Sequence, residues 1–133
     1  TNENDTYLNM AEDYAIVLNP TDTVQIEGAT DIFDSPLYND LFLINTGPST
    51  TSLDIIVSWS TGEDDIDLYV FDSGGSLVAS SQTVATDAEP ATPLNVAVSG
   101  NSVYYINTEF FLHGDGGPKT APGTQYFLDV TAN

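Results

Sequence analysis

The stretch SLDIIVSWSTGEDDIDLYVFDSGGSLVASS, residues 52–81, decides the fold of this chain. Its first part, Ser52 to Trp59, places an apolar residue at every second position, which is typical of a strand with one face in a core. Ile66 to Phe71 alternates in the same way after an acidic turn, so we expect the two runs to form a hairpin. After Asp72, two glycines allow the positive φ of a tight turn, and Ser76 to Ser80 returns as another strand. The stretch therefore predicts a three-stranded meander, with Trp59 and Leu68 in the core.

Short alternating runs bounded by Gly, Pro, Asn, Asp and Ser continue along the rest of the chain. They predict further strands at Tyr14–Leu18, Thr23–Glu27, Leu41–Asn45, Leu94–Val98, Val103–Thr108 and Gln125–Thr131. About eight antiparallel strands in 133 residues indicate an all-β, single-domain β-sandwich of the jelly-roll type. We expect residues 1–22 to form an N-terminal arm or edge strand and residues 23–133 to form the sandwich. Residues 83–93 and 113–123 are expected to be surface loops.

The chain is strongly acidic, with 20 Asp and Glu against a single basic residue, Lys119, and a formal net charge of -19. Nucleic acid and anionic membrane surfaces are excluded as partners, because both require clustered Lys and Arg. A folded chain of this charge repels itself, so concentrated salt or bound cations must offset the repulsion. Calcium is the expected cofactor. The alternative is that the acids serve only solubility.

The chain has no cysteine, so a disulfide framework, a Cys metal site and a Cys nucleophile are ruled out. It begins with Thr1 rather than Met and has no apolar run long enough to span a bilayer. We therefore expect a mature exported product or an excised domain. The scarcity of Lys and Arg also removes trypsin-type cleavage sites. These features favour an extracellular or cell-surface location.

The run from Asp65 to Ser81 resembles the central hairpin of the bacterial pre-peptidase C-terminal (PPC) domain family, which has a D-x-D-L-Y-L-Y-D-x-x-G-x-L-V-A-S pattern. The matching positions are Asp65, Asp67, Leu68, Tyr69, Asp72, Gly75, Leu77 and Val78. Residues 39–42 stand where the family has a D-x-D-Y-F strand entry, and residues 102–107 and 123–131 are similar to its final hairpin. The resemblance implies a β-sandwich of the kind appended to secreted proteases and other exported proteins, itself without catalytic activity.

Dense carboxylates precede and begin the Ile66 to Phe71 strand. Alternation places Asp65 and Asp67 on one face, where like charges repel unless a cation lies between them. Hard oxygen ligands of this kind suit calcium, while a solvated polar face is the alternative and an acid–base pair of a glycosidase is a third reading. The N-terminal Glu3-Asn4-Asp5 is similar to the family's E-P-N-N motif, which supplies calcium ligands in some members. The candidate metal ligands are therefore Glu3, Asn4, Asp5, Asp40, Asp64, Asp65 and Asp67.

Aromatic residues lie on both faces of several predicted strands. Adjacent pairs such as Phe110-Phe111 and Tyr126-Phe127 cannot both point inward, so either loops cover the outer rings or the rings form an exposed patch. The candidate binding residues are Tyr69, Phe71, Phe110 and Phe111. Asn4 begins an N-glycosylation sequon, Asn-Asp-Thr. The lone His113 stands in a Gly-rich loop without a G-x-S-x-G motif, so no catalytic residue is predicted.

Two functions fit these features, and an enzyme of its own is a distant third. The first is a cation-stabilised structural protein whose copies assemble into an extracellular filament or surface layer, so that the partner is a second copy in a homo-oligomer or polymer. The candidate edge strands Tyr14–Leu18 and Gln125–Thr131 contain no proline or lysine, the residues that commonly protect sheet edges. The second is an accessory module of a secreted hydrolase that binds a polysaccharide or a fibrous protein.

Overall fold

The structure is a computed structural model that describes residues 11–29, 38–59, 65–82, 88–111 and 125–133. The described residues form nine strands and contain no helix, so none of them belongs to a helix that could cross a membrane. The strands are β1 (Glu12–Leu18), β2 (Thr23–Ala29), β3 (Tyr38–Thr46), β4 (Ser52–Trp59), β5 (Asp65–Asp72), β6 (Leu77–Ser81), β7 (Ala88–Ala97), β8 (Val103–Phe111) and β9 (Gln125–Ala132).

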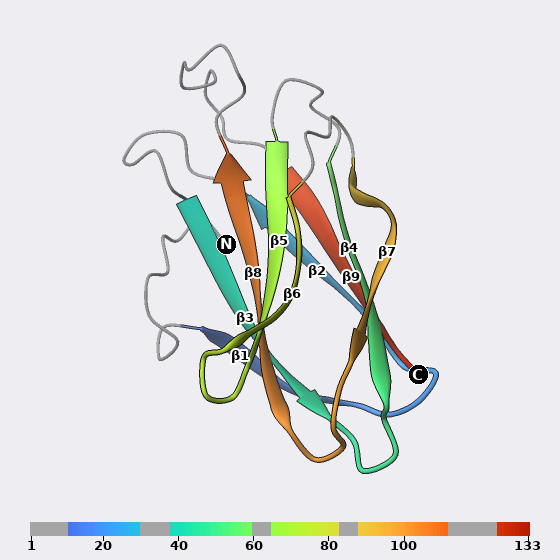
Figure 1. Cartoon of the computed structure of the whole chain (residues 1–133). Coiled ribbons are helices and arrows are strands. Elements are labelled where there is room, and N and C mark those ends of the chain that lie inside the picture. Colours follow the sequence, from blue (N-terminus) through green and yellow to red (C-terminus); the bar gives the residue numbers. More distant parts are fainter. Residues whose placement is uncertain (1–10, 30–37, 60–64, 83–87, 112–124) are drawn as a thin grey trace.

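The nine strands form two sheets packed face to face (Figure 1). The five-stranded sheet has the order β1-β3-β8-β5-β6, and the four-stranded sheet has the order β2-β9-β4-β7. All pairs are antiparallel except β1 with β3, which run parallel. The predicted all-β sandwich is confirmed: each of the nine strands overlaps a run in which the sequence predicted one, and one pair is parallel. The division of the chain at residue 22 stays a prediction.

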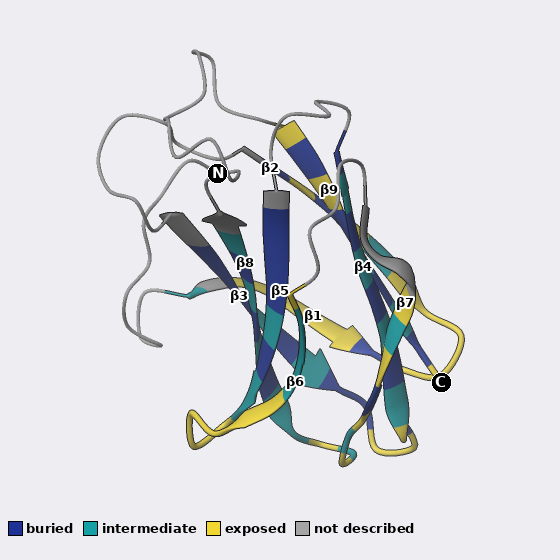
Figure 2. Cartoon of the chain, turned by 45° about the horizontal axis from the view of Figure 1, so that its top comes forward, coloured by how far each residue is buried: buried dark blue, intermediate teal, exposed yellow. Residues whose placement is uncertain are grey.

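Inward and outward side chains alternate strictly along β4, and the inward ones form part of the core. The inward positions of β4, among them Leu53 and Ile55, are fully buried, and Trp59 at its end is buried too. On β5 the inward face carries Leu68, so both predicted core residues are confirmed. Their counterparts on the other strands complete one continuous hydrophobic core, shown as buried in Figure 2. Burial of this apolar surface is the main force that holds the two sheets together.

The turn after β5 has the chemistry that the sequence predicts. Gly75 has a φ of 84°, a left-handed conformation that glycine adopts without steric cost. The carboxylate of Asp72 accepts hydrogen bonds from the backbone N–H groups of Gly74 (2.9 Å) and Ser76 (3.0 Å). The β5–β6 hairpin is therefore confirmed.

Two strand pairings expected from the sequence are wrong: β4 with β5, and β8 with β9. β4 and β5 are in opposite sheets, and so are β8 and β9, so neither pair forms a hairpin. β9 is also not an edge strand, because it lies between β2 and β4. The reason is physical: alternation reveals which face of a strand is buried, but both sheets of a sandwich bury the same kind of face.

Residues 83–93 are not simply a loop, because β7 begins at Ala88 and contains Pro90 and Pro93. β7 lies at the edge of its sheet, where a proline without an N–H group is tolerated. Its pairing with β4 is regular over Leu94 to Ala97 but shifts register between the partners of Ile55 and Val57. The two prolines fall within that irregular part and protect this edge.

Candidate functional site

The predicted metal ligands fall into three groups. Glu3, Asn4, Asp5 and Asp64 lie outside the described residues, and with Asn4 lies the predicted glycosylation site. Asp65 is placed only by its backbone, at the first position of β5. Asp40 and Asp67 are described, and both are buried. His113, which carried no predicted role, also lies outside the described residues.

Asp40 lies inside the sandwich. It pairs in register with Thr108 of β8, and both are buried together with the Tyr126 ring of the opposite sheet. The Thr108 hydroxyl donates to the Tyr126 hydroxyl (3.0 Å), which in turn donates to Oδ2 of Asp40 (2.5 Å). This chain of hydrogen bonds joins the two sheets and solvates a buried carboxylate. The arrangement gives Asp40 a structural role in the core.

Asp67 lies on the opposite face of the same sheet. It pairs in register with Glu109 of β8, and the next pair along the strands is Tyr69 with Asn107. Directly paired residues on one face of a sheet lie close together, so two carboxylates meet here. Burial together with the charges of Glu109 and Asp67 raises the pKa of Tyr69 to about 12. Burial also raises the pKa of Glu109 above its usual value.

We call Asp67, Glu109 and Asn107 the outer oxygen cluster. The Oδ1 atom of Asn107 is buried and makes no hydrogen bond within the described part of the chain. Carboxylate and amide oxygens are the ligands that calcium prefers, so this donor set fits that ion. The described residues contain no group of three acidic, His or Cys side chains of metal-binding geometry. Asp40 faces the core and is separated from the cluster by the sheet.

Calcium binding stays a prediction, and a melting experiment tests it. Relative to the melting temperature in chelator, calcium should give a larger increase than sodium chloride of the same ionic strength gives. The reason is that an ion bound at a specific site binds the folded chain and not the unfolded one. Asp67→Asn should remove the part of the shift that is specific to calcium. The exposed Asp22 supplies the matched control, because Asp22→Asn removes the same charge far from the cluster. Equal shifts with calcium and sodium would leave only screening.

Glu109 should make stability fall as the pH rises. Because its pKa is raised in the folded state, the folded chain holds a proton that the unfolded chain has released, so stability declines between the ordinary glutamate pKa and the raised one. In chelator, Glu109→Gln should lack this decline and melt at a higher temperature than the parent at neutral pH. Thermal melts from pH 4 to 7 measure both effects. A variant with the parent's pH profile would contradict this assignment.

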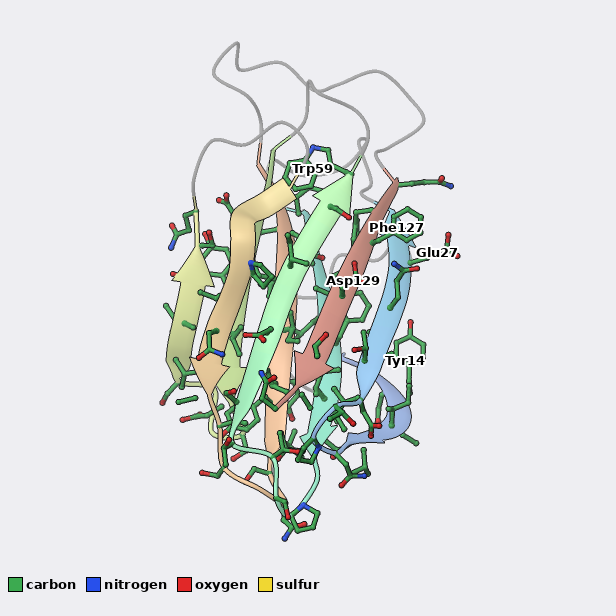
Figure 3. The ribbon with its side chains drawn as sticks, turned by 90° about the vertical axis from the view of Figure 1, so that its right-hand side faces the viewer. Tyr14, Glu27, Trp59, Phe127 and Asp129 are labelled. Atoms are coloured by element: carbon green, nitrogen blue, oxygen red, sulfur yellow. The ribbon has the colours of Figure 1, made fainter. Side chains whose placement is uncertain are left out.

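The predicted binding aromatics do not form one exposed face among the described residues. Tyr69 and Phe71 are half-buried on the outer face of β5. Phe110 and Phe111 are placed only by their backbones, which end β8 and pair with Ile66 and Asp65. Of the pair Tyr126-Phe127, the first is buried and the second is exposed, as alternation requires. Phe127 lies on the outer face of the four-stranded sheet, with Glu27 and Asp129 nearby (Figure 3).

Exposed hydrophobic side chains gather elsewhere, on the two edge strands of the five-stranded sheet. Six large hydrophobic residues are exposed in the described part of the chain, and five of them belong to β1 or β6. They are Tyr14, Ile16 and Val17 of β1 and Leu77 and Val78 of β6. Figure 2 shows β1 largely in the colour of exposed residues, and β6 in that colour at its start and in the colour of intermediate burial beyond. We call these two strands the apolar edges.

The edges of the four-stranded sheet differ. β7 carries two prolines, and β2 presents the exposed residues Thr23, Gln25 and Glu27 on its outer face. Prolines and charged side chains are the devices that keep sheet edges from pairing with other chains. In β6, by contrast, the sequence LVASS contains no charged residue and no proline. β6 therefore carries neither of these devices, whereas β1 carries charge only at its start, at Glu12 and Asp13.

Two solved structures share this architecture over nearly the whole chain. The pre-peptidase C-terminal domain of a collagenase from Bacillus anthracis is 17% identical, with a TM-score of 0.54, 91% of this chain covered and 96% of that one. PliG, a periplasmic inhibitor of g-type lysozyme from Aeromonas hydrophila, is 9% identical, with a TM-score of 0.54, 92% of this chain covered and 100% of that one. No protein-family model and no curated protein sequence matches the chain. The chain is a PPC-like β-sandwich in fold, and identities this low leave its function to be argued from its own surface.

Proposed function

We propose that this chain is a non-catalytic extracellular structural protein whose copies assemble through their sheet edges into a filament or surface layer. The observation that carries the proposal is the pair of apolar edges at opposite ends of one sheet. A strand at a sheet edge can pair with a strand of another chain, which adds main-chain hydrogen bonds and buries exposed apolar side chains. Two such edges on one molecule allow the addition to repeat.

The charge of the chain sets the conditions for assembly. Each copy carries a formal charge of -19, so copies repel until salt or bound cations reduce the repulsion. The Debye length falls to about 8 Å at physiological ionic strength, so contacts between the apolar edges then escape most of the long-range repulsion. Assembly should therefore strengthen as sodium chloride or calcium is added. Assembly of this kind would suit a protein that functions outside the cell in a saline medium.

Sedimentation velocity and negative-stain microscopy of the full chain test the proposal. We expect polymers in saline buffer with calcium at high protein concentration. The double variant Val17→Glu/Val78→Glu places one charge on each apolar edge and should be a folded monomer. Phe127→Glu is the matched control, because it also replaces an exposed hydrophobic residue with glutamate, but on a central strand, and it should polymerise. A parent chain that stays monomeric with and without calcium would rule out the proposal.

The alternative function is an accessory module that binds a polysaccharide or a fibrous protein. The observation in its favour is the outer face of the four-stranded sheet, where Phe127 lies among polar side chains held in place by hydrogen bonds (Figure 3). Gln25 donates to Asp129 (2.9 Å) at the next position of this face, and Asn95 donates to Asp54 (2.7 Å) further along it. An aromatic ring beside fixed carboxylates and amides suits stacking on a sugar. Retention of the parent chain on insoluble polysaccharide or collagen, lost in Phe127→Ala, would establish this function instead.

A further inference from the structure

We infer that β6 of one copy pairs antiparallel with β1 of the next, so that the five-stranded sheet continues head to tail through the assembly. The inference rests on the proposed function and adds which strands meet and in which direction. The first observation behind it is the direction of each strand within the sheet. β1 runs parallel to β3, whereas β8 runs antiparallel to β3 and to β5, and β6 runs antiparallel to β5. Hence β1 and β6 point in opposite directions, and copies that continue the sheet without reversal meet as an antiparallel pair.

The side chains of the two strands match in this direction. Aligning Leu77 with Val17 places Val78 opposite Ile16, Ala79 opposite Ala15, Ser80 opposite Tyr14 and Ser81 opposite Asp13. The hydrophobic start of β6 then meets the hydrophobic end of β1. The serine hydroxyls at the end of β6 meet the tyrosine and aspartate at the start of β1, where they can donate to the Asp13 carboxylate. Such cross-strand pairs are the unit of sheet stabilisation.

Junctions between identical strands match less well. Two copies of β1 in antiparallel pairing would set the Asp13 carboxylate of each against the hydrophobic Val17 region of the other. Two copies of β6 would set Leu77 against Ser81 at both ends. In either case apolar groups would face polar groups, and no new hydrogen bond would offset the cost of desolvating the polar groups. The junction between β6 and β1 avoids both mismatches and places only one acidic strand in each contact.

β1 is held at one end and irregular in the middle. The Leu18 carbonyl accepts hydrogen bonds from the Thr50 hydroxyl (2.7 Å) and the Gly47 N–H (2.8 Å), which anchor the end of the strand. Its pairing with β3 shifts register between Asp13 and Val17, and Ala15 there has a φ of 54°. The left-handed conformation is strained for alanine, because its Cβ approaches the following carbonyl oxygen. Pairing with an incoming β6 requires Ala15 to adopt an extended conformation. That change removes the strain, so it favours opening of the irregular segment between Asp13 and Val17.

The geometry also determines the kind of assembly. A contact between two different surfaces repeats without limit unless it closes into a ring, and the right-handed twist of sheets rotates each added copy relative to the last. The expected product is a polar helical filament with a free β1 at one end and a free β6 at the other. A layer built from two-fold contacts would have no such polarity.

A mixing experiment with the two single variants tests the inference. Val17→Glu blocks β1 and leaves β6 intact, whereas Val78→Glu blocks β6 and leaves β1 intact. Both positions are about half exposed, at 52% and 44%, so the substitutions should not prevent folding, which circular dichroism verifies. Each variant alone should be a monomer. An equimolar mixture should give a one-to-one dimer of twice the monomer mass and nothing larger, because only one intact β6 and one intact β1 remain per pair.

Native mass spectrometry with one variant isotope-labelled identifies the composition of the dimer, and Phe127→Glu, which should polymerise like the parent, controls for the added charge. Dimers of either variant alone would overturn the inference in favour of contacts between identical strands. A mixture that stays monomeric while the parent polymerises would also overturn it and would indicate a different surface. A parent chain that never polymerises would instead remove the proposed function itself.

Discussion

Leu68→Ala should lower the free energy of unfolding by about 2–5 kcal/mol, a large fraction of the stability of a domain of this size. Leu68 lies on the inward face of β5 with no exposed surface, between the two sheets of the sandwich. Truncation removes the Cγ atom and the two Cδ methyl groups from the core and leaves a cavity that rigid strands on both sides cannot fill. Urea denaturation followed by Trp59 fluorescence measures the loss.

Leu77 provides the control for this experiment. It is the same residue type, on the next strand of the same sheet, but its side chain is 53% exposed. Leu77→Ala should therefore change the free energy of unfolding by about 0.5 kcal/mol or less under conditions where the chain is monomeric. Equal losses at the two positions would mean that the inward face of β5 is assigned wrongly.

Gly28→Ala should cost roughly 2–6 kcal/mol, because it disturbs both the packing of the Tyr126 ring and the hydrogen-bond chain that joins the sheets. Gly28 pairs in register with Tyr126, and a Cβ atom at this position would lie 2.2 Å from the ring of that tyrosine. The ring must move, which costs about 1–3 kcal/mol in a packed core. Its hydroxyl then leaves Asp40, and a buried carboxylate that loses a donor costs about 1–3 kcal/mol more.

Two further variants separate the contributions. Gly74→Ala is the matched control, because its Cβ would meet only the Asp72 carboxylate at 3.4 Å, an ordinary contact, and it should cost about 0.5 kcal/mol or less. Tyr126→Phe removes the hydroxyl and keeps the ring, so it should cost only the hydrogen-bond part. A Gly28→Ala variant as stable as Gly74→Ala would show that the sheets do not depend on this contact.

The site illustrates the limits of sequence reasoning. Asp67 was identifiable because it stands in an alternating strand within a PPC-like motif, whereas its partners Glu109 and Asn107 were not identified. They lie some forty residues further along the chain, on β8, and no local pattern shows that β8 is the strand beside β5. Asp40 and Asp67 appeared equivalent as acidic residues near strand starts. Only the pleat of each strand, combined with the sheet to which it belongs, places one inside the core and the other outside.

The sequence by itself determined the local features of this protein: the strands, the inward face of β4 and β5, the Asp72 turn, the acidic surface and the absence of thiol chemistry. Each depends on residues close together in the chain, through the two-residue period of a strand or the φ preference of glycine. Only the tertiary structure decided that β4 and β5 separate into different sheets, that β9 is central, and that β1 and β6 end the same sheet. Those outcomes depend on which strands exchange hydrogen bonds, and every strand offers the same backbone donors and acceptors.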